Sequence, residues 1–268
     1  MSRIQHSTRR DQTENVRQTR AVQGGLQSAR TRPLLLGHRG ARSLTHFRLR
    51  AAKPNVPPEN TLASFEYALA SGCDGFEFDV RATRDGKLAI CHNAWVRGHK
   101  VDASSFESLC SRCRTTLPCL QDVLRGFGNR AYLDIEVKAS GCETNVVEAI
   151  RQHRPISRYM VSSFLPQVLR QVHHLDHSVP LGYVCNRAVN LPIWRDLPIK
   201  VFLPHHLLIT KDLVDRVHER GLQLYTWTVN HEQELRQFAE WGVDGLISDD
   251  PKLLYRVFRD RSSIADKC

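Results

Sequence analysis

Short apolar runs alternate with amphipathic segments along most of this chain. The apolar runs are predicted as buried strands over Leu34–Leu36, Phe76–Val80, Leu88–Cys91, Tyr132–Val137, Tyr159–Ser162, Leu181–Val184, Val201–Leu203, Leu222–Val229 and Gly245–Ser248. The segments between them place apolar residues on one face and are predicted as helices over 60–71, 120–124, 143–151, 165–173, 211–219 and 231–240, with a last helix from Pro251. This alternation indicates a parallel sheet, closed or open.

The length of the chain, 268 residues, is near that of one (β/α)₈ barrel. We therefore predict an α/β fold, a distorted (β/α)₈ TIM barrel, as a single domain over residues 33–260. Nine predicted strands exceed the eight places of such a barrel, so one of them must be peripheral. The link from Val80 to Leu88 is too short for a helix, so this unit must be irregular. The basic segment 42–57 is predicted as a surface loop.

Residues 1–32 lack sustained apolar periodicity and are predicted as a disordered tail. They hold seven Arg and two acids, so +5 of the formal net charge of +10 lies in this tail. A solvated tail is the simplest interpretation, although such a tail can also bind nucleic acid or an anionic membrane. The tail has no apolar segment of a secretory signal. We therefore expect a cytoplasmic protein, with a transit peptide as the alternative.

No window of the sequence is long and apolar enough to span a membrane. The eight cysteines, without a secretory signal, are expected to stay reduced. Cys110 and Cys113, followed by Cys119, resemble half of a zinc site, but no partner pair stands at the spacing of a zinc finger or ribbon.

The first segment with candidate chemistry is Gly37-His38-Arg39-Gly40, directly after a predicted strand. Two glycines let the backbone turn sharply and let a ligand approach closely. The turn would present an imidazole and a guanidinium at the carboxyl end of a strand, which is the active face of a barrel. Taken alone, this segment is better explained as an ordinary loop with a solvated Arg and a capping His.

Acidic residues at a spacing of two mark two further strands. Glu77 and Asp79 would share one face of a strand, about 7 Å apart, and Glu136 would share a face with Lys138. Such inward acids are costly to bury unless a cation compensates them, and carboxylates suit Mg²⁺ or Ca²⁺. The alternatives are a half-exposed strand for the first pair and an internal ion pair for the second.

His92 follows the predicted strand Leu88–Cys91 and is a candidate general acid or base. Each of these signals is weak singly. Jointly, two histidines, an arginine, a lysine and three acids at strand ends are what phosphoryl transfer requires. The cations offset phosphate charge and the imidazoles move protons on the entering and leaving oxygens.

The same residues, in the same order, resemble the motifs of the glycerophosphodiester phosphodiesterases over residues 34–258. The matching segments are His38-Arg39-Gly40, Pro58-Glu59-Asn60-Thr61, Glu77-Phe78-Asp79-Val80, Asp85-Gly86, His92, Leu117-Pro118-Cys119-Leu120, Ile135-Glu136-Val137-Lys138, Ser162-Ser163-Phe164, Trp227-Thr228-Val229-Asn230 and Gly245-Leu246-Ile247-Ser248-Asp249. The ordered set is far more specific than any one segment.

The resemblance implies a distorted barrel that hydrolyses glycerophosphodiesters to glycerol 3-phosphate and an alcohol. It implies His38 and His92 as the acid–base pair. Glu77, Asp79 and Glu136 are implied as ligands of one divalent cation, Mg²⁺ or Ca²⁺. The implied substrate contacts are Arg39 and Lys138 at the phosphate, Glu59 near the metal or the glycerol hydroxyls, and Trp227 as an aromatic wall.

The chain departs from the family pattern at three places. Eighteen residues separate Gly40 from Glu59, more than is usual, so the first loop is enlarged and basic and would either reshape the pocket or favour an anionic, lipid-bearing surface. Asn93 replaces the Asp that commonly follows the second histidine. The segment 93–118 is too short to hold a sizeable inserted domain.

Two other functions stay open at this point. A lysophospholipase D would keep the chemistry and act on lysophospholipids, as the basic loop suggests. A non-catalytic barrel would serve as a binding or scaffold protein, with the tail contacting nucleic acid or membrane. The complete set of chemical residues argues against the second, so no nucleic acid is expected as partner. The head group, the metal and the oligomeric state are not determined by the sequence.

Overall fold

The computed structural model describes residues 32–42, 56–113, 116–156 and 158–259. The predicted disordered tail, apart from Arg32, and most of the predicted loop 42–57 lie outside these residues. None of the helices in the described part of the chain has the length and apolar character that a membrane crossing requires.

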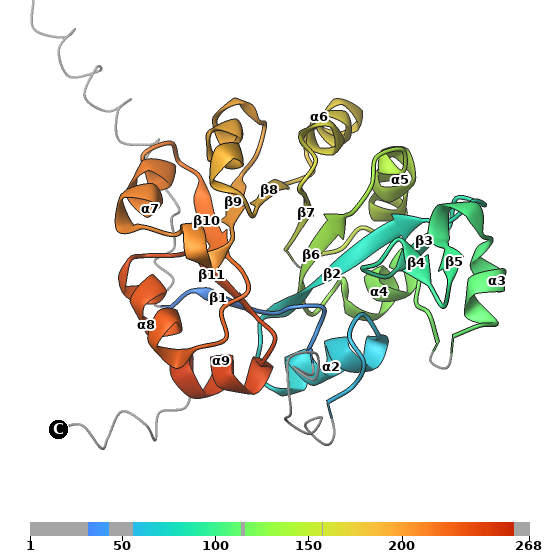
Figure 1. Cartoon of the computed structure of the whole chain (residues 1–268), viewed down its shortest axis with the longest axis horizontal. Helices are drawn as coiled ribbons and strands as arrows, with labels where there is room; N and C mark the ends of the chain where they lie inside the picture. The colour runs from blue at the N-terminus through green and yellow to red at the C-terminus, as the bar shows by residue number, and fades with distance from the viewer. Residues whose placement is uncertain (1–31, 43–55, 114–115, 157, 260–268) are drawn as a thin grey trace, which may run out of the picture. The chain divides into compact units, whose positions relative to one another are not determined.

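Within the described residues, eight parallel strands close into a barrel (Figure 1). Their order is β1-β11-β10-β9-β8-β7-β6-β2, and the pairing of β1 with β2 completes the circle. Their bounds are β1 Leu34–Gly37, β2 Gly75–Ala82, β6 Tyr132–Val137, β7 Tyr159–Ser163, β8 Leu181–Cys185, β9 Val201–Pro204, β10 Gln223–Thr226 and β11 Gly245–Ser248. The prediction of a TIM barrel is confirmed.

Helices surround these strands on the outside (Figure 1). They are α2 Leu62–Ala70, α4 Leu120–Phe127, α5 Glu143–His153, α6 Pro166–Leu175, α7 Lys211–His218, α8 Glu232–Glu240 and α9 Pro251–Phe258, with the 3₁₀ segments η2 Ala188–Asp196 and η3 His206–Leu208. The helix predicted over 60–71 starts only at Leu62, because the Thr61 hydroxyl caps it by accepting from the Ser64 N–H.

Of the nine predicted strands, the peripheral one is the third along the chain, predicted over Leu88–Cys91. It is β3, Leu88–Ile90, and it pairs antiparallel with β2, with Ile90 opposite Val80. A turn with Gly86 at φ +75° sends the chain straight back, so a hairpin replaces the usual helix. Interpreting residues 88–91 as a barrel strand would be wrong.

Beyond β3 the chain builds a small appendage that the apolar pattern did not predict. It consists of β4 Trp95–Val96, β5 His99–Lys100, η1 Val101–Ala103 and α3 Phe106–Cys110. A separate apolar cluster supports it, made of Ala89, Cys91, Val101, Leu109 and Leu117. The appendage lies beside β2 and β3 (Figure 1).

Alternation along β2 decides what enters the barrel. Phe76 and Phe78 pack outward against α2 and α4, and the Phe76 ring stacks on Phe65 with centroids 4.3 Å apart. Glu77 and Asp79 therefore point to the interior. The interior's apolar floor is a different cluster, formed by Leu34, Leu36, Met160, Val184, Val201, Leu203, Tyr225 and Ile247. The acids thus lie above this apolar cluster, toward the carboxyl ends of the strands.

Candidate active site

The loop after β1 presents His38 and Arg39 at the mouth of the barrel. Gly37 and Gly40 permit this turn, because a Cβ on Gly37 would lie 1.8 Å from the carbonyl oxygen of Gly40, and Gly40 has φ of +80°. Ser64 in α2 fixes the loop by donating its hydroxyl to the carbonyl oxygen of Arg39 (3.0 Å). Both predicted side chains therefore leave a turn that is tied to the first turn of a helix.

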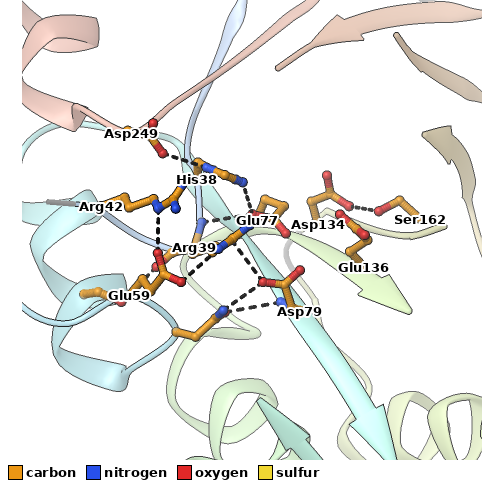
Figure 2. Close-up of polar contacts among 12 residues, drawn as sticks. His38, Arg39, Arg42, Glu59, Glu77, Asp79, Asp134, Glu136, Ser162 and Asp249 are labelled. Atoms are coloured by element: carbon orange, nitrogen blue, oxygen red, sulfur yellow. Dashed lines mark hydrogen bonds and ion pairs between the residues drawn. The ribbon is translucent and has the colours of Figure 1, made fainter. Parts of the chain in front are cut away.

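His38 lies between two buried acids, Glu77 in β2 and Asp249 directly after β11 (Figure 2). Its Nδ1 is 2.7 Å from Asp249 Oδ1, and its Nε2 is 3.8 Å from Glu77 Oε2. Asn230 holds Asp249 from the other side, donating its amide to Oδ2 (2.8 Å) and accepting the backbone N–H of Asp249 (3.0 Å). Since the carboxylate of Asp249 accepts the Nδ1 proton, Nε2 is the nitrogen of His38 that faces the acids.

The three predicted metal ligands converge. One carboxylate oxygen each of Glu77, Asp79 and Glu136 lies within 4.8 Å of the others. Strand register is the reason, because Asp79 in β2 stands directly opposite Glu136 in β6. All three side chains are buried. Among the described residues this is the one group of His, Cys, Asp or Glu side chains arranged to hold a metal ion.

The electrostatics of this group fit a divalent cation. Burial raises the pKa of Glu77 well above its usual range, and the charges of Asp79 and Glu136 add to the effect. Burial also raises the pKa of Glu136, against the opposite influence of Lys138. Within the described part of the chain, no donor reaches the buried Oε1 of Glu77. An uncompensated acid with an unpaired oxygen is costly in a protein interior unless a cation binds it.

Arg39 is held by three acids of the site. Its backbone N–H donates to Glu77 Oε2 (2.9 Å), its Nη1 donates to Glu59 Oε1 (2.8 Å), and its Nε lies 3.2 Å from Asp79 Oδ2. Arg42 Nε lies 2.8 Å from the other oxygen of Glu59, which therefore bridges two arginines (Figure 2). Glu59 thus positions Arg39.

Lys138 closes the opposite side of the acid group. Its Nζ donates to Glu136 Oε1 (2.5 Å) and lies 3.3 Å from Asp79 Oδ1. Asn60 donates its amide to the other oxygen of Asp79 (2.8 Å). Burial raises the pKa of Asp79, but the charges of Lys138 and Arg39, with the hydrogen bond from Asn60, hold this pKa below its usual value. Asp79 is therefore the acid of the group that is already ionised.

His92 reaches the site from the antiparallel strand β3. The Cys91 N–H donates to the carbonyl oxygen of Asp79 (3.0 Å), which brings His92 level with that acid. Its Nδ1 is 3.0 Å from Asn93 Oδ1, so the Asn that replaces the family's Asp still contacts the imidazole. Burial lowers the pKa of His92, and the charge of Asp79 acts in the opposite direction.

Trp227 forms an aromatic wall at the far side of the mouth. Its Nε1 donates to the carbonyl oxygen of Leu203 (2.9 Å), and its ring meets Phe164 edge-on with centroids 5.5 Å apart. The ring of His205 contacts the same indole, also edge-on, at 5.1 Å. The Nζ of Lys138 lies 5.3 Å from the centre of the Phe164 ring. The wall is therefore continuous with the acid group.

The structure brings all nine predicted site residues to this mouth. They are His38, Arg39, Glu59, Glu77, Asp79, His92, Glu136, Lys138 and Trp227. The sequence interpretation gave no role to Asp249, Asn60 and Phe164, although each lies in a motif that it quoted. Asp249 follows β11 just as His38 follows β1, so the rule that found His38 could also have found it.

Asp134 is a further buried acid, and it is not one of the three candidate metal ligands Glu77, Asp79 and Glu136. It stands opposite Glu77 in the β2–β6 register, and its Oδ1 accepts the Ser162 hydroxyl (2.6 Å). Burial raises its pKa to about 8, while Ser162 acts in the opposite direction. From about pH 4, where the unfolded chain releases this proton, to about pH 8, only the folded protein keeps it.

The metal-free protein should therefore lose free energy of unfolding as pH rises across this window, and Asp134→Asn should remove part of the loss. We expect the variant to gain on the order of a few kcal/mol over the wild type between pH 4 and pH 8. Denaturant unfolding of both proteins at several pH values, with chelator present, measures the difference. A difference that does not change with pH would show that Asp134 is ionised in the folded state.

This geometry can be set beside known proteins. The model of the glycerophosphoryl diester phosphodiesterase family matches residues 38–253, which include all nine residues of the mouth. The chain belongs to this family. It is accordingly a phosphoric diester hydrolase.

This chain aligns with nearly the whole length of two relatives from the family. It is 31% identical to the glycerophosphodiester phosphodiesterase of Bacillus altitudinis, over 79% of this chain and 96% of that protein. It is 29% identical to that of Caldanaerobacter subterraneus subsp. tengcongensis, over 78% and 96%. An Oleispira antarctica phosphodiesterase, solved with the product sn-glycerol-3-phosphate, has the same fold with a TM-score of 0.70 at 22% identity, covering 88% of this chain and 98% of that one.

Proposed function

We propose that this family member hydrolyses glycerophosphodiesters to glycerol 3-phosphate and an alcohol, using one divalent cation and two histidines. The observation that carries the proposal is the convergence of Glu77, Asp79 and Glu136 within 4.8 Å, beside an imidazole held 3.8 Å from Glu77. A relative solved with sn-glycerol-3-phosphate supports the same product.

Glu77, Asp79 and Glu136 would hold the cation. Carboxylate oxygens suit Mg²⁺ and Ca²⁺, and the burial of this group favours a bound cation of either kind. When bound, the cation neutralises charge on a phosphate oxygen. Arg39 and Lys138, which flank Asp79 from two sides, would bind further phosphate oxygens. Glu59 keeps the guanidinium of Arg39 turned toward the site.

His38 and His92 would move the protons. Asp249 keeps the Nδ1 proton on His38, so that Nε2 can accept a proton from a nucleophile or donate one to a leaving oxygen. His92 is partly buried next to Asp79 and serves the other oxygen of the diester. The nucleophile is water or the neighbouring glycerol hydroxyl by way of a cyclic phosphate.

The function is tested by measuring hydrolysis of glycerophosphoglycerol, glycerophosphocholine and lysophosphatidylcholine with Mg²⁺, with Ca²⁺ and with chelator. We expect glycerol 3-phosphate to form from the first two diesters, and chelator to abolish its formation. Faster hydrolysis of lysophosphatidylcholine would instead identify a lysophospholipase D. Absence of hydrolysis with every metal, together with DNA binding that falls steeply with salt, would identify a non-catalytic binding protein.

A further inference from the structure

A hollow opens on the side of His92, and it is also lined by Asn60, which donates a hydrogen bond to Asp79. It has a volume of about 270 Å³, and His92 lines it while His38 does not. The side chains that could contact a ligand in the hollow include those of Asn93, Trp95, Arg97 and Thr116. The hollow therefore adjoins one of the two histidines and lies apart from the aromatic wall of Trp227.

The wall of this hollow is built by the appendage. A tight turn with Arg97 at φ +51° and Gly98 at φ +81° pairs β4 with β5, and the Val101 N–H donates to the carbonyl oxygen of Ala94 (2.9 Å). Val96 packs onto the appendage's own apolar cluster. Its neighbour Trp95 points the other way and is 59% exposed. An indole left out of the core, at the rim of a hollow, is suited to stacking on a ligand.

The charges of the lining do not attract a cation. Glu59 is the one acid among the described lining residues, and both of its oxygens already lie 2.8 Å from arginine nitrogens, those of Arg39 and Arg42. Arg97 adds a further positive charge. A quaternary ammonium group would find the Trp95 ring but no unpaired carboxylate. The lining thus favours uncharged groups that can form hydrogen bonds.

The size of the hollow also restricts its occupant. About 270 Å³ lies below the roughly 300–1,000 Å³ of pockets that enclose drug-sized ligands. A polyol head group fits such a space, with its C–H face on Trp95 and its hydroxyls near the side chains of Asn93 and Thr116. A long acyl chain would extend out of it.

Building on the proposed function, we propose that this hollow is the subsite for the alcohol of the diester, and that it takes a neutral polyol such as glycerol in preference to an alkylammonium alcohol. The glycerol 3-phosphate part then lies toward the aromatic wall of Trp227 and Phe164. The alcohol oxygen that leaves phosphorus lies beside His92.

The test compares kcat/KM for three diesters of glycerol 3-phosphate, with glycerol, choline or methanol as the alcohol. The wild type should prefer the glycerol diester to the choline diester by about tenfold. In Trp95→Ala, the ratio of glycerol diester to methyl diester should fall about tenfold, because methanol cannot reach the indole. Trp95→Phe should restore most of the ratio, and Arg97→Glu should shift preference toward choline.

Ile156→Ala is the matched control, since Ile156 is another exposed apolar side chain and lies outside the hollow and the mouth. Equal losses on all three diesters in Trp95→Ala, or a wild-type preference for choline, would overturn the subsite. Failure of the wild type to hydrolyse any diester would instead overturn the proposed function.

Discussion

Glu77→Gln is expected to lower metal-dependent hydrolysis by roughly three orders of magnitude or more, and to raise the free energy of unfolding of the metal-free protein at pH 7. The amide cannot replace a carboxylate as ligand of a hard cation. It keeps the shape of Glu77 and can still accept the backbone N–H of Arg39. Hydrolysis assays measure the loss of activity, and denaturant unfolding with chelator present measures the change in the free energy of unfolding.

The rise in stability follows from the sign of the pKa shift. Burial and neighbouring acids raise the pKa of Glu77 in the folded protein. Stability from such a group is complete below the pKa of the unfolded chain and is lost as pH rises above it. At pH 7 the wild type carries this loss and Glu77→Gln does not, so the variant should gain on the order of a kcal/mol or more.

Asp134→Asn is the matched control for this substitution. Asp134 is as buried as Glu77, stands opposite it in the strand register, and is not part of the group of three acids. The Asp134→Asn variant should gain stability in the same way as Glu77→Gln, and it should keep most of the wild-type activity. If Glu77→Gln kept more than about a tenth of wild-type activity, Glu77 would not be a metal ligand.

His92→Ala and His38→Ala are both expected to lose roughly 10²- to 10⁴-fold in kcat on glycerophosphoglycerol, but they should differ on a nitrophenyl diester. The hollow for the alcohol adjoins His92, so His92 is expected to protonate the leaving oxygen. Nitrophenolate leaves without a proton. His92→Ala should therefore lose far less on the nitrophenyl diester, whereas His38→Ala should lose equally on both substrates.

Rates of the two variants on the two substrates decide this assignment. If His38→Ala instead lost far less kcat on the nitrophenyl diester than on glycerophosphoglycerol, the roles of the histidines would be reversed. The alcohol would then lie on the side of Asp249. Asp249→Asn offers a further check, because an amide that donates to Nδ1 would leave Nε2 protonated and unable to act as base. A loss in both histidine variants smaller than tenfold would remove the imidazoles from the mechanism.

The sequence by itself determined the fold class and singled out the nine residues that meet at the mouth of the barrel. Strands alternating with helices predicted the barrel, and a spacing of two placed Glu77 and Asp79 on one face of a strand. These inferences succeed because backbone geometry fixes them locally. The count of nine predicted strands also showed that one strand was in excess, and the short link from Val80 to Leu88 showed that this unit is irregular.

Contacts between strands that are far apart in the sequence could be decided only by the tertiary structure. The register that sets Asp79 against Glu136 joins two strands 57 positions apart, and the partner of His38 is 211 positions away. The strand before His92 runs antiparallel to β2, as its short link through Gly86 requires, but only the tertiary structure shows that this pairing brings His92 level with Asp79. The appendage, and with it the hollow beside His92, exists because a small apolar cluster packs separately from the barrel core, and such packing is a property of the folded chain alone.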